Sequence, residues 1–218
     1  MKLHYETTSP LLKEILLAIM RNPIFKPFYL VGGTSLSLRL GHRKSVDIDL
    51  FTPAPYGSLD YSLFEKFFQE NYPYYYCTDK TGIVGLGRSY YIGKSKDCSI
   101  KVDAYYYSEI IDPCDIIDDI RMASLADVTA MKMDVVSRGG RKKDFWDLHE
   151  LLCTYSLSEM LDFHKQRHEY THDRSQIIAN FSNFSSADED IDPICLKNKD
   201  WRFIKMDLLM LTRPFSKK

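Results

Sequence analysis

The hydrophobic and polar residues in the first part of the chain follow two different periods. Apolar residues recur at positions 12, 15, 16 and 19, directly after Ser9 and Pro10, a spacing and a start typical of an amphipathic helix. Short apolar runs at residues 28–31 and 46–51 predict two buried strands. The residues between them predict a short helix that begins after a glycine pair and ends at Gly41.

A second amphipathic helix and a tyrosine-rich series of strands follow. The helix is expected over residues 58–71. Its expected apolar face consists of Leu59, Leu63, Phe64, Phe67 and Phe68. Between residues 72 and 107, apolar stretches alternate with glycine and charged turns, which predicts a meander of strands. The expected strands cover residues 72–78, 82–87, 89–93 and 98–107.

The pattern changes after residue 110. An acidic stretch at residues 112–119 reads as a connector, and the remainder has helical periodicity. The expected helices cover residues 124–138, 144–155, 156–170, 173–184 and 200–211. The order of elements predicts an α+β fold, in which a sheet with helices precedes a mainly helical C-terminal half. We divide the chain into residues 1–118 and residues 119–218, and expect the second part to complete a cleft on the first.

Composition narrows the class of protein. With 44% hydrophobic residues among 218, the chain can form a core, and a net charge of −1 argues against binding nucleic acid through overall charge. The five cysteines include no C-x-x-C pair, which fits free thiols in a reducing compartment. The first ten residues lack the apolar segment of a secretory signal, and we find no apolar run of the ~20 residues that span a bilayer. We therefore expect a cytoplasmic protein without membrane contact.

The stretch GGTSLSLRLGHRKSVDIDLF, residues 32–51, carries the first chemical signal. A glycine pair between a strand and a helix leaves backbone N–H groups of Gly32, Gly33 and Thr34 at a helix N-terminus, where they favour a phosphate. Asp47 and Asp49 lie on one face of the next strand because side chains alternate along a strand. Paired carboxylates are suited to Mg²⁺ or Mn²⁺, which proteins hold together with substrate phosphates. The alternative is a plain glycine turn followed by a solvated strand face.

These residues, together with LADVTAMKMDVVSRGGRKKDFWDL at residues 125–148, resemble the AbiEii/AbiGii toxin family of nucleotidyltransferases. The resemblance covers residues 28–155. It implies a polymerase-beta-like nucleotidyltransferase fold, with a mixed sheet flanked by helices. It also implies a toxin of a toxin–antitoxin or phage-defence pair, with a cognate antitoxin as partner.

The resemblance implies roles for further residues. Asp103, from another strand, is the expected third metal-binding and catalytic carboxylate, although a solvent-facing aspartate on an edge strand fits the sequence equally well. Lys132 is expected to contact the phosphates of the nucleotide. The alternative for Lys132 is a stem packed beside a core stripe, with its ammonium in water. That expected stripe consists of Leu125, Val128, Met131 and Val135.

Charged residues after position 137 complete the expected site. Asp144 and Asp147 are three apart and so share a helix face. The resemblance implies that Asp144 orients Lys132 or binds the nucleotide, and that Asp147 supports it as one of the nucleotide-binding residues. Capping of the helix is an equal alternative for Asp144. Arg43 is placed close enough to the acidic pair to reach the nucleotide.

A basic turn between two expected helices is expected to contact RNA or triphosphate. The alternative is a solvent-exposed turn that only joins the two helices. Its basic residues are Arg138, Arg141, Lys142 and Lys143.

The expected activity is metal-dependent transfer of a nucleotidyl group from a nucleoside triphosphate to an RNA acceptor, tRNA foremost. Two alternatives stay open: transfer to a hydroxyl of a small molecule or a protein, and a catalytically silent protein that binds a nucleotide or a partner. The pair of carboxylates at Asp47 and Asp49 favours an active enzyme.

Overall fold

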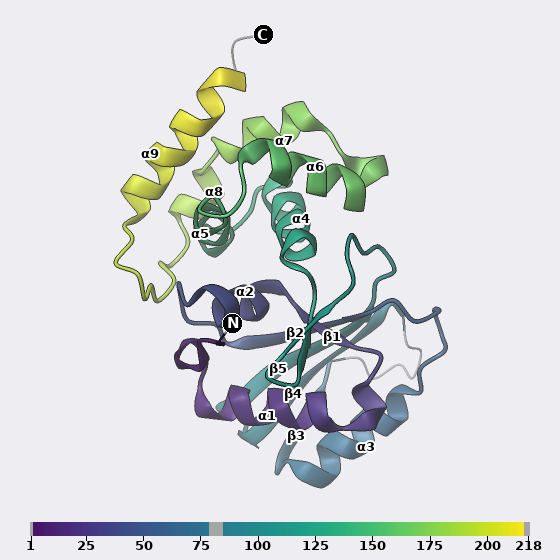
Figure 1. The fold of residues 1–218 in the computed structure, drawn as a ribbon. Coiled ribbons are helices and arrows are strands. Elements are labelled where there is room, and N and C mark those ends of the chain that lie inside the picture. Colours follow the sequence, from purple (N-terminus) through teal and green to yellow (C-terminus); the bar gives the residue numbers. More distant parts are fainter. Residues whose placement is uncertain (1, 79–84, 216–218) are drawn as a thin grey trace.

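The computed structural model describes residues 2–78 and 85–215 and has two halves (Figure 1). A mixed sheet with helices forms one half, and a group of helices forms the other. The described strands are β1 (Tyr29–Val31), β2 (Asp47–Thr52), β3 (Tyr74–Cys77), β4 (Gly87–Ser95), β5 (Cys98–Tyr106), β6 (Asp115–Ile117) and β7 (Ile120–Met122). The α+β fold expected from the sequence is confirmed.

The described helices follow the predicted order. They are α1 (Pro10–Arg21), α2 (Gly32–Leu40), α3 (Tyr61–Asn71), α4 (Leu125–Ser137), α5 (Lys142–Leu151), α6 (Leu157–Arg167), α7 (Arg174–Phe181), α8 (Ser185–Asp188) and α9 (Trp201–Thr212). Ser9 caps α1 by accepting a hydrogen bond from the backbone N–H of Leu12 at 3.1 Å. Gly41 ends α2 with φ +65°. Among the described residues, no helix is both long and apolar enough to cross a membrane.

The sheet has seven strands in the order β3-β4-β5-β2-β1-β7-β6. Strand β2 is antiparallel to β1 and parallel to β5, so the centre of the sheet brings together segments about fifty residues apart in the sequence. In the parallel pair, Asp49 of β2 is directly beside Asp103 of β5. Asp103 therefore lies on an inner strand, and the edge-strand alternative is wrong.

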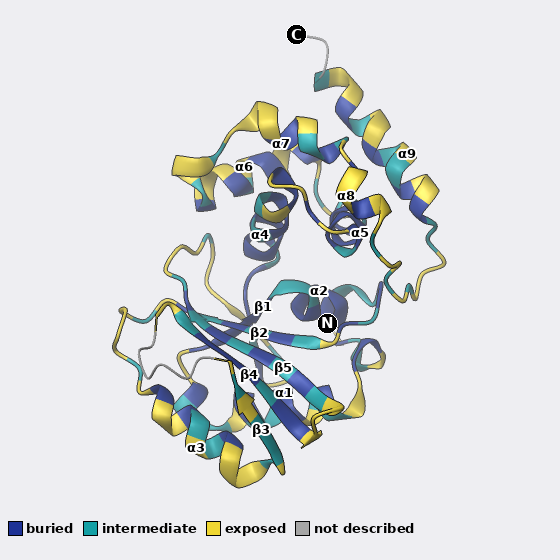
Figure 2. Ribbon diagram, turned by 180° about the vertical axis from the view of Figure 1, so that it is seen from behind, coloured by how far each residue is buried: buried dark blue, intermediate teal, exposed yellow. Residues whose placement is uncertain are grey.

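The two faces of the sheet contact different parts of the chain (Figures 1 and 2). On one face, α1 and α3 cover a core that contains Ile48, Leu50, Val102, Phe64 and Phe68. On the other face, α2 and the helical half lie over the part of the sheet around β1 and β2. Because side chains alternate along β2 and β5, burying Ile48, Leu50 and Val102 against α1 and α3 turns the aspartates toward the helical half.

The helical half has a core of its own. Phe145 and Trp146 of α5 pack with Trp201 of α9 and Phe181 of α7, and all four are at most 9% exposed. This core extends to the sheet through Val31, which is 0% exposed. The contact fixes α4 and α5 over the end of β1, which is where α2 begins.

Several expectations about single elements are wrong. The acidic connector is instead the β6–β7 hairpin, and Leu30 of β1 pairs with Met122 of β7. The expected boundary after residue 118 falls in the turn of this hairpin. Val46 precedes β2 and is 66% exposed, and Leu63 is 48% exposed on α3. Of the strand expected at residues 82–87, residues 82–84 lie outside the described part of the chain, and only Gly87 of the remainder belongs to a strand.

The face that α4 buries also differs from the expected stripe. Met133 and Val136 are the fully buried apolar residues in the middle and last turns, whereas Val135 is 37% exposed. Of the expected stripe, Val128 belongs to the core and is 0% exposed, and Leu125 and Met131 pack against it. Val128, Met131 and Val135 also line a cleft beside Lys132. An apolar stripe at helical spacing looks the same in the sequence whether it faces a core or the wall of a binding cleft.

Candidate active site

A cleft of about 260 Å³ lies where β2, β5 and the start of α2 face α4 and α5. The side of the cleft formed by the sheet carries the acidic residues Asp47, Asp49 and Asp103. The opposite side carries Lys132, Arg141, Lys143 and Asp144 from the helical half. The two halves of the chain together therefore form a cleft with carboxylates on one wall and mostly cations on the other.

The glycine pair brings the backbone close to the acids. Gly32 has φ +68°, and a Cβ on it would lie 2.3 Å from Oδ2 of Asp49. Val31, which precedes α2, has no polar side chain to cap the helix. The first N–H groups of α2, from Gly32 and Gly33, therefore lie beside the carboxylates, in a position suited to a phosphate.

The hydroxyl of Thr34 is engaged inside the protein. It lies 2.8 Å from Oγ of Ser45 and donates to the backbone carbonyl of Asp47, and Thr34 is 1% exposed. The backbone N–H of Thr34, rather than this hydroxyl, is the group predicted to meet a phosphate. The hydroxyl fixes the backbone at the start of β2, where Asp47 stands.

The acids of the sheet repel one another. Burial, followed by the neighbouring charges of Asp103 and Asp47, raises the pKa of Asp49 to about 6. Lys101 donates to Oδ2 of Asp103 at 2.6 Å, and Oδ1 of Asp103 is buried without a hydrogen-bond partner among the described residues. Lys101 was not among the predicted site residues, although a cation two residues before Asp103 shares its strand face.

These carboxylates fit a divalent cation that substrate phosphates help to hold. Within residues 2–78 and 85–215, no three histidine, cysteine or acidic side chains form a ready-made metal cluster. Mg²⁺ does not need one, because it is commonly bound by one or two carboxylates, water and substrate phosphates. The raised pKa of Asp49 and the unpartnered oxygen of Asp103 mark carboxylate oxygens that lack a positive partner.

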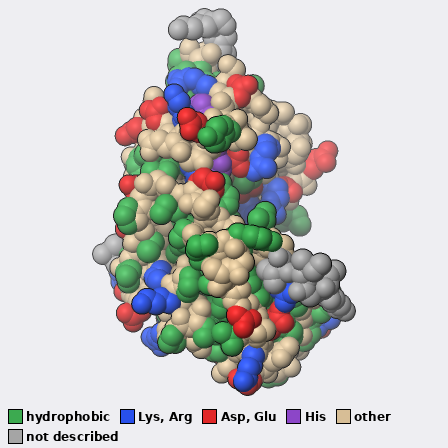
Figure 3. Space-filling view, turned by 90° about the vertical axis from the view of Figure 1, so that its right-hand side faces the viewer, with side chains coloured by type: hydrophobic (Ala, Val, Ile, Leu, Met, Phe, Trp, Pro, Cys, Tyr) green, Lys and Arg blue, Asp and Glu red, His purple; other side chains and the backbone are tan. Residues whose placement is uncertain are grey.

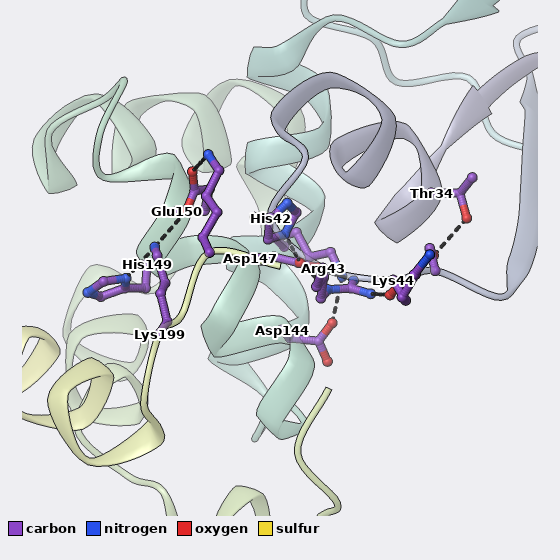
Figure 4. Close-up of polar contacts among 12 residues, drawn as sticks. Thr34, His42, Arg43, Lys44, Asp144, Asp147, His149, Glu150 and Lys199 are labelled. Carbon is purple, nitrogen blue, oxygen red and sulfur yellow. Dashed lines mark hydrogen bonds and ion pairs between the residues drawn. The ribbon is translucent and has the colours of Figure 1, made fainter. Parts of the chain in front are cut away.

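Asp147 is the centre of a buried ionic network (Figure 4). Its Oδ1 accepts hydrogen bonds from Nε2 of His42 at 2.7 Å and Nε of Arg43 at 2.6 Å. Its Oδ2 lies 2.7 Å from both Nη2 of Arg43 and Nζ of Lys132. Burial alone would raise the pKa of Asp147, but Lys132, Arg43 and the hydrogen bond from His42 hold it well below its usual value.

The network engages two of the expected nucleotide-binding residues. Asp147 is 0% exposed and is absent from the cleft lining, and its contact with a nucleotide stays a prediction. Arg43 lines the cleft, but its guanidinium is held by Asp147 and by the carbonyl of Lys44. His42 follows Gly41 in the turn after α2 and is fully buried. The network thus joins the turn after α2 to α4 and α5 behind the wall of the cleft.

Lys132 lies between two carboxylates. Its Nζ is 2.7 Å from Oδ1 of Asp144 and 2.7 Å from Oδ2 of Asp147. Although burial opposes it, Asp147 and Asp144 raise the pKa of Lys132, which is therefore charged at neutral pH. Lys132 is 7% exposed, so the alternative with its ammonium in water is wrong.

Asp144 combines the two roles weighed for it. Its Oδ1 binds Lys132, and its Oδ2 accepts from the backbone N–H of Arg141 at 3.1 Å, in a capping arrangement at the start of α5. Because both oxygens are used, Asp144 holds Lys132 in place at the first turn of α5. Contact of either residue with a nucleotide stays a prediction.

The basic turn divides into residues inside and outside the cleft. Lys142 is 5% exposed and pairs with Asp192 at 2.8 Å, and Arg138 pairs with Asp134 on the surface. Neither residue lines the cleft, although Arg138 is exposed on the surface. Arg141 and Lys143 line the cleft. Burial and the neighbouring charges of Arg141, Lys132 and Arg43 lower the pKa of Lys143, and the opposing effect of Asp144 is smaller.

Comparison with known proteins identifies the family. A sequence model described as "Nucleotidyl transferase AbiEii toxin, Type IV TA system" matches residues 14–218. The chain belongs to this family. It is a nucleotidyltransferase, and membership of the AbiEii family implies a nucleoside triphosphate substrate and an antitoxin partner.

The chain is also similar to one curated protein and to solved structures. The uncharacterized protein aq_aa25 of Aquifex aeolicus is 29% identical over 192 residues, which cover 82% of this chain and 84% of that one. JHP933 from Helicobacter pylori has a similar structure, with a TM-score of 0.59 at 18% identity, over 94% of this chain and 90% of that one. The nucleotidyltransferase toxin MenT4 from Mycobacterium tuberculosis has a TM-score of 0.54 at 13% identity, over 93% of this chain and 83% of that one. The two structures confirm the nucleotidyltransferase fold.

Replacing Gly32 with alanine is expected to lower the free energy of unfolding by about 1–3 kcal/mol from the left-handed backbone alone. The added Cβ also collides with Asp49, so the full loss is expected to be larger. Gly57→Ala is the matched control, because Gly57 has φ +78° and a Cβ there meets nothing within 4 Å. Urea unfolding of both variants separates the cost of the left-handed backbone from the cost of the collision with Asp49. Equal losses would mean that the approach to Asp49 is unimportant.

Proposed function

We propose that the protein uses a divalent cation to transfer a nucleotidyl group from a nucleoside triphosphate to a hydroxyl at the end of an RNA, tRNA foremost. The observation that carries this proposal is the two-sided cleft. Three carboxylates on the sheet face cations on the helical half, and the N-terminus of α2 lies beside them. Such a layout is suited to a triphosphate on one wall and cation-assisted chemistry on the other.

Asp47 and Asp49 would hold the cation, with Asp103 as the third carboxylate. The cation, Mg²⁺ or Mn²⁺, supplies neutralisation of charge on the reacting phosphate. The N–H groups of Gly32 and Gly33 bind phosphate oxygens, and Arg141 and Lys143 bind them from the opposite wall. The acceptor hydroxyl attacks the α-phosphorus in line and pyrophosphate leaves. The unpartnered Oδ1 of Asp103 is placed to accept the proton of that hydroxyl.

An RNA acceptor needs local positive charge, because the whole chain has a net charge of −1. Figure 3 shows basic and acidic side chains interspersed over one side of the molecule rather than a single broad basic face. The cations gathered on the cleft wall are the local source. This distribution favours an acceptor that enters with its end in the cleft.

Labelling tests the proposal directly. The purified protein is incubated with total RNA, Mg²⁺ and each α-labelled nucleoside triphosphate in turn. We expect label to appear in one or a few RNA bands, and to disappear when Asp47→Asn replaces the wild type. Label that appears only on small molecules or on protein would show that the acceptor is not RNA.

Replacing Lys143 with glutamine is expected to weaken triphosphate binding by about 1.5–3 kcal/mol, the usual contribution of a hydrogen bond to a charged group. Lys143 lines the cleft, and its pKa is lowered by burial and by the cations around it, so its removal relieves repulsion and leaves the fold intact. Lys165→Gln, on the exposed surface of α6, makes the same change in charge and serves as the control. Calorimetric titration measures both affinities. An unchanged affinity in Lys143→Gln would place the triphosphate elsewhere.

A further inference from the structure

A groove of about 820 Å³ adjoins the cleft on the side of β4 and β3. Asp47 and Lys101 line both the groove and the cleft, so the two lie side by side. Its other walls carry three tyrosines, Tyr74, Tyr76 and Tyr91. Neither the family description nor the mechanism above gives these side chains a role.

The tyrosines stand in register with the catalytic acids. Tyr76 of β3 pairs with Tyr91 of β4, Tyr91 pairs with Lys101 of β5, and Lys101 pairs with Asp47 of β2. Neighbouring strands are about 5 Å apart, so Tyr91 lies roughly 10 Å and Tyr76 roughly 15 Å from Asp47 along this row. The row leads directly from the acids across the sheet.

The tyrosines of these strands divide between the two faces. Tyr90 is 0% exposed, and its ring centroid is 5.1 Å from that of Phe68 on α3. Tyr75 packs against the same core. In contrast, Tyr76 is 41% exposed on the other face. The rings of Tyr76 and Tyr91 pack together, with centroids 6.3 Å apart, and both side chains line the groove.

We infer that the tyrosine groove binds the unpaired bases that precede the acceptor hydroxyl of an RNA, by stacking them on Tyr91 and Tyr76. This inference rests on the proposed RNA acceptor. Aromatic rings beside a cationic track are the usual means of holding single-stranded RNA, because every base has a face that stacks. Lys96 and Lys101 line the groove and supply the cations for the backbone.

The direction of the reaction assigns the groove to the acceptor rather than to the triphosphate. In phosphoryl transfer the attacking and leaving oxygens lie on opposite sides of the phosphorus. The glycine turn of α2 follows β1, on one side of β2, and the tyrosines are on the other side, beyond β5. A triphosphate bound beside the glycine turn therefore leaves the tyrosine side for the attacking hydroxyl.

Another groove fits the rest of the incoming nucleotide. It measures about 400 Å³, and Arg43, Arg141 and Lys143 line it together with residues 190–194. It also reaches Asp47, and it shares Val46 and Asp47 with the tyrosine-lined groove. Its lining carries the carboxylates of Asp190 and Asp192 as well as the three cations.

The test is direct binding of a fluorescent single-stranded RNA twelve nucleotides long, with the unmodified hydroxyl at its 3′ end. Tyr91→Leu and Tyr76→Leu are each expected to raise its Kd about 5- to 100-fold, the effect of losing one stacked base. Tyr91→Phe keeps the ring and should bind as the wild type does. Tyr170→Leu, at a residue 98% exposed in the helical half, is the control. The Kd of the triphosphate should change less than about twofold in all four variants.

A second set of RNAs identifies the base that is bound. Each carries one abasic nucleotide near its 3′ end. If the missing base is the one that stacks on Tyr91, the abasic RNA should bind the wild type with the same raised Kd that intact RNA shows for Tyr91→Leu. The Kd of the abasic RNA for Tyr91→Leu should then be only slightly higher than either. Additive losses at every position would overturn the inference.

Other outcomes are equally decisive. If Tyr91→Leu weakens triphosphate binding and leaves RNA binding unchanged, the groove holds the base of the incoming nucleotide and the inference is wrong. If neither affinity changes in folded variants, the tyrosines only stabilise the sheet. Should Tyr91→Leu fail to fold, Tyr76→Leu at its more exposed position decides. RNA that binds independently of the tyrosines refutes this inference alone, whereas failure of RNA to bind the wild type refutes the proposed acceptor as well.

Discussion

Replacing Asp49 with asparagine is expected to reduce nucleotidyl transfer about 100-fold or more, and at the same time to stabilise the metal-free protein. The loss of activity follows because the amide is a poor ligand for the cation that the carboxylates would hold. The gain in stability follows because burial and the charges of Asp103 and Asp47 oppose ionisation of Asp49. A residue needed only for stability would show the opposite sign.

The gain should depend on pH. The pKa of Asp49 is about 6 in the folded protein, against about 4 in an unfolded chain. The stability conferred by protonated Asp49 is complete below pH 4 and is lost as the pH rises through 6. Asp49→Asn does not undergo this loss, so its advantage should appear between pH 4 and 6 and reach at most about 3 kcal/mol.

Urea unfolding at pH 4, 5, 6 and 7, together with transfer assays, measures both effects. Asp97→Asn, in the exposed turn between β4 and β5, makes the same change in charge away from the cleft and is the control. Transfer at the wild-type rate by Asp49→Asn would rule out this carboxylate as a catalytic ligand. A lower stability of Asp49→Asn than of the wild type at pH 7 would show that nearby cations already stabilise the ionised carboxylate of Asp49.

Replacing Asp147 with asparagine is expected to cost about 3–5 kcal/mol of folding stability at pH 7, as removal of one member of a buried ionic network usually does. The carboxylate is fully buried and receives hydrogen bonds from His42 and Arg43, and its other cationic partner is Lys132. Asparagine keeps the shape but leaves these cations without compensating charge. Arg43 is affected most, because Lys132 retains Asp144.

The pH dependence has the opposite sign to that of Asp49. The pKa of Asp147 lies well below its usual value, so its contribution is present above pH 4 and is lost as the pH falls through the lowered pKa. Wild type and Asp147→Asn should therefore converge in strong acid. Asp162→Asn, on the exposed side of α6, is the control in urea unfolding at pH 7 and pH 3. A difference below about 1 kcal/mol at pH 7 would contradict the importance of the network.

Local patterns in the sequence determined most of the elements. The N-cap and apolar spacing of α1 predicted its bounds, because a helix of this kind buries one stripe and its cap lies next to it in the chain. The alternation around Asp47 and Asp49 predicted that they share a face. The glycine pair and Gly41 predicted both ends of α2, where positive φ angles occur. Each of these features depends on residues within a few positions of one another.

Only the tertiary structure decided how distant segments meet. The pairing of Asp49 with Asp103 depends on the parallel register of β2 and β5, and no local pattern specifies which strands become neighbours. The bonds between Arg43 and Asp147 join residues 104 positions apart. From the sequence, Asp147 therefore looked like a partner for the nucleotide rather than a buried anchor for His42, Arg43 and Lys132.

Local sequence also does not predict which way the side chains of neighbouring residues point. Lys142 and Lys143 are adjacent in the sequence, yet Lys142 turns toward Asp192 and Lys143 toward the cleft. The apolar residues of α4 could face a core or a cleft, and the docking of the helical half on β1 and α2 decided between them. The sequence by itself determined which side chains are available for chemistry, because the order of residues along the chain fixes their types and local spacing. The packing of the two halves decided which of them share a site, because free energy from long-range burial and pairing selects one arrangement among many that the local patterns allow.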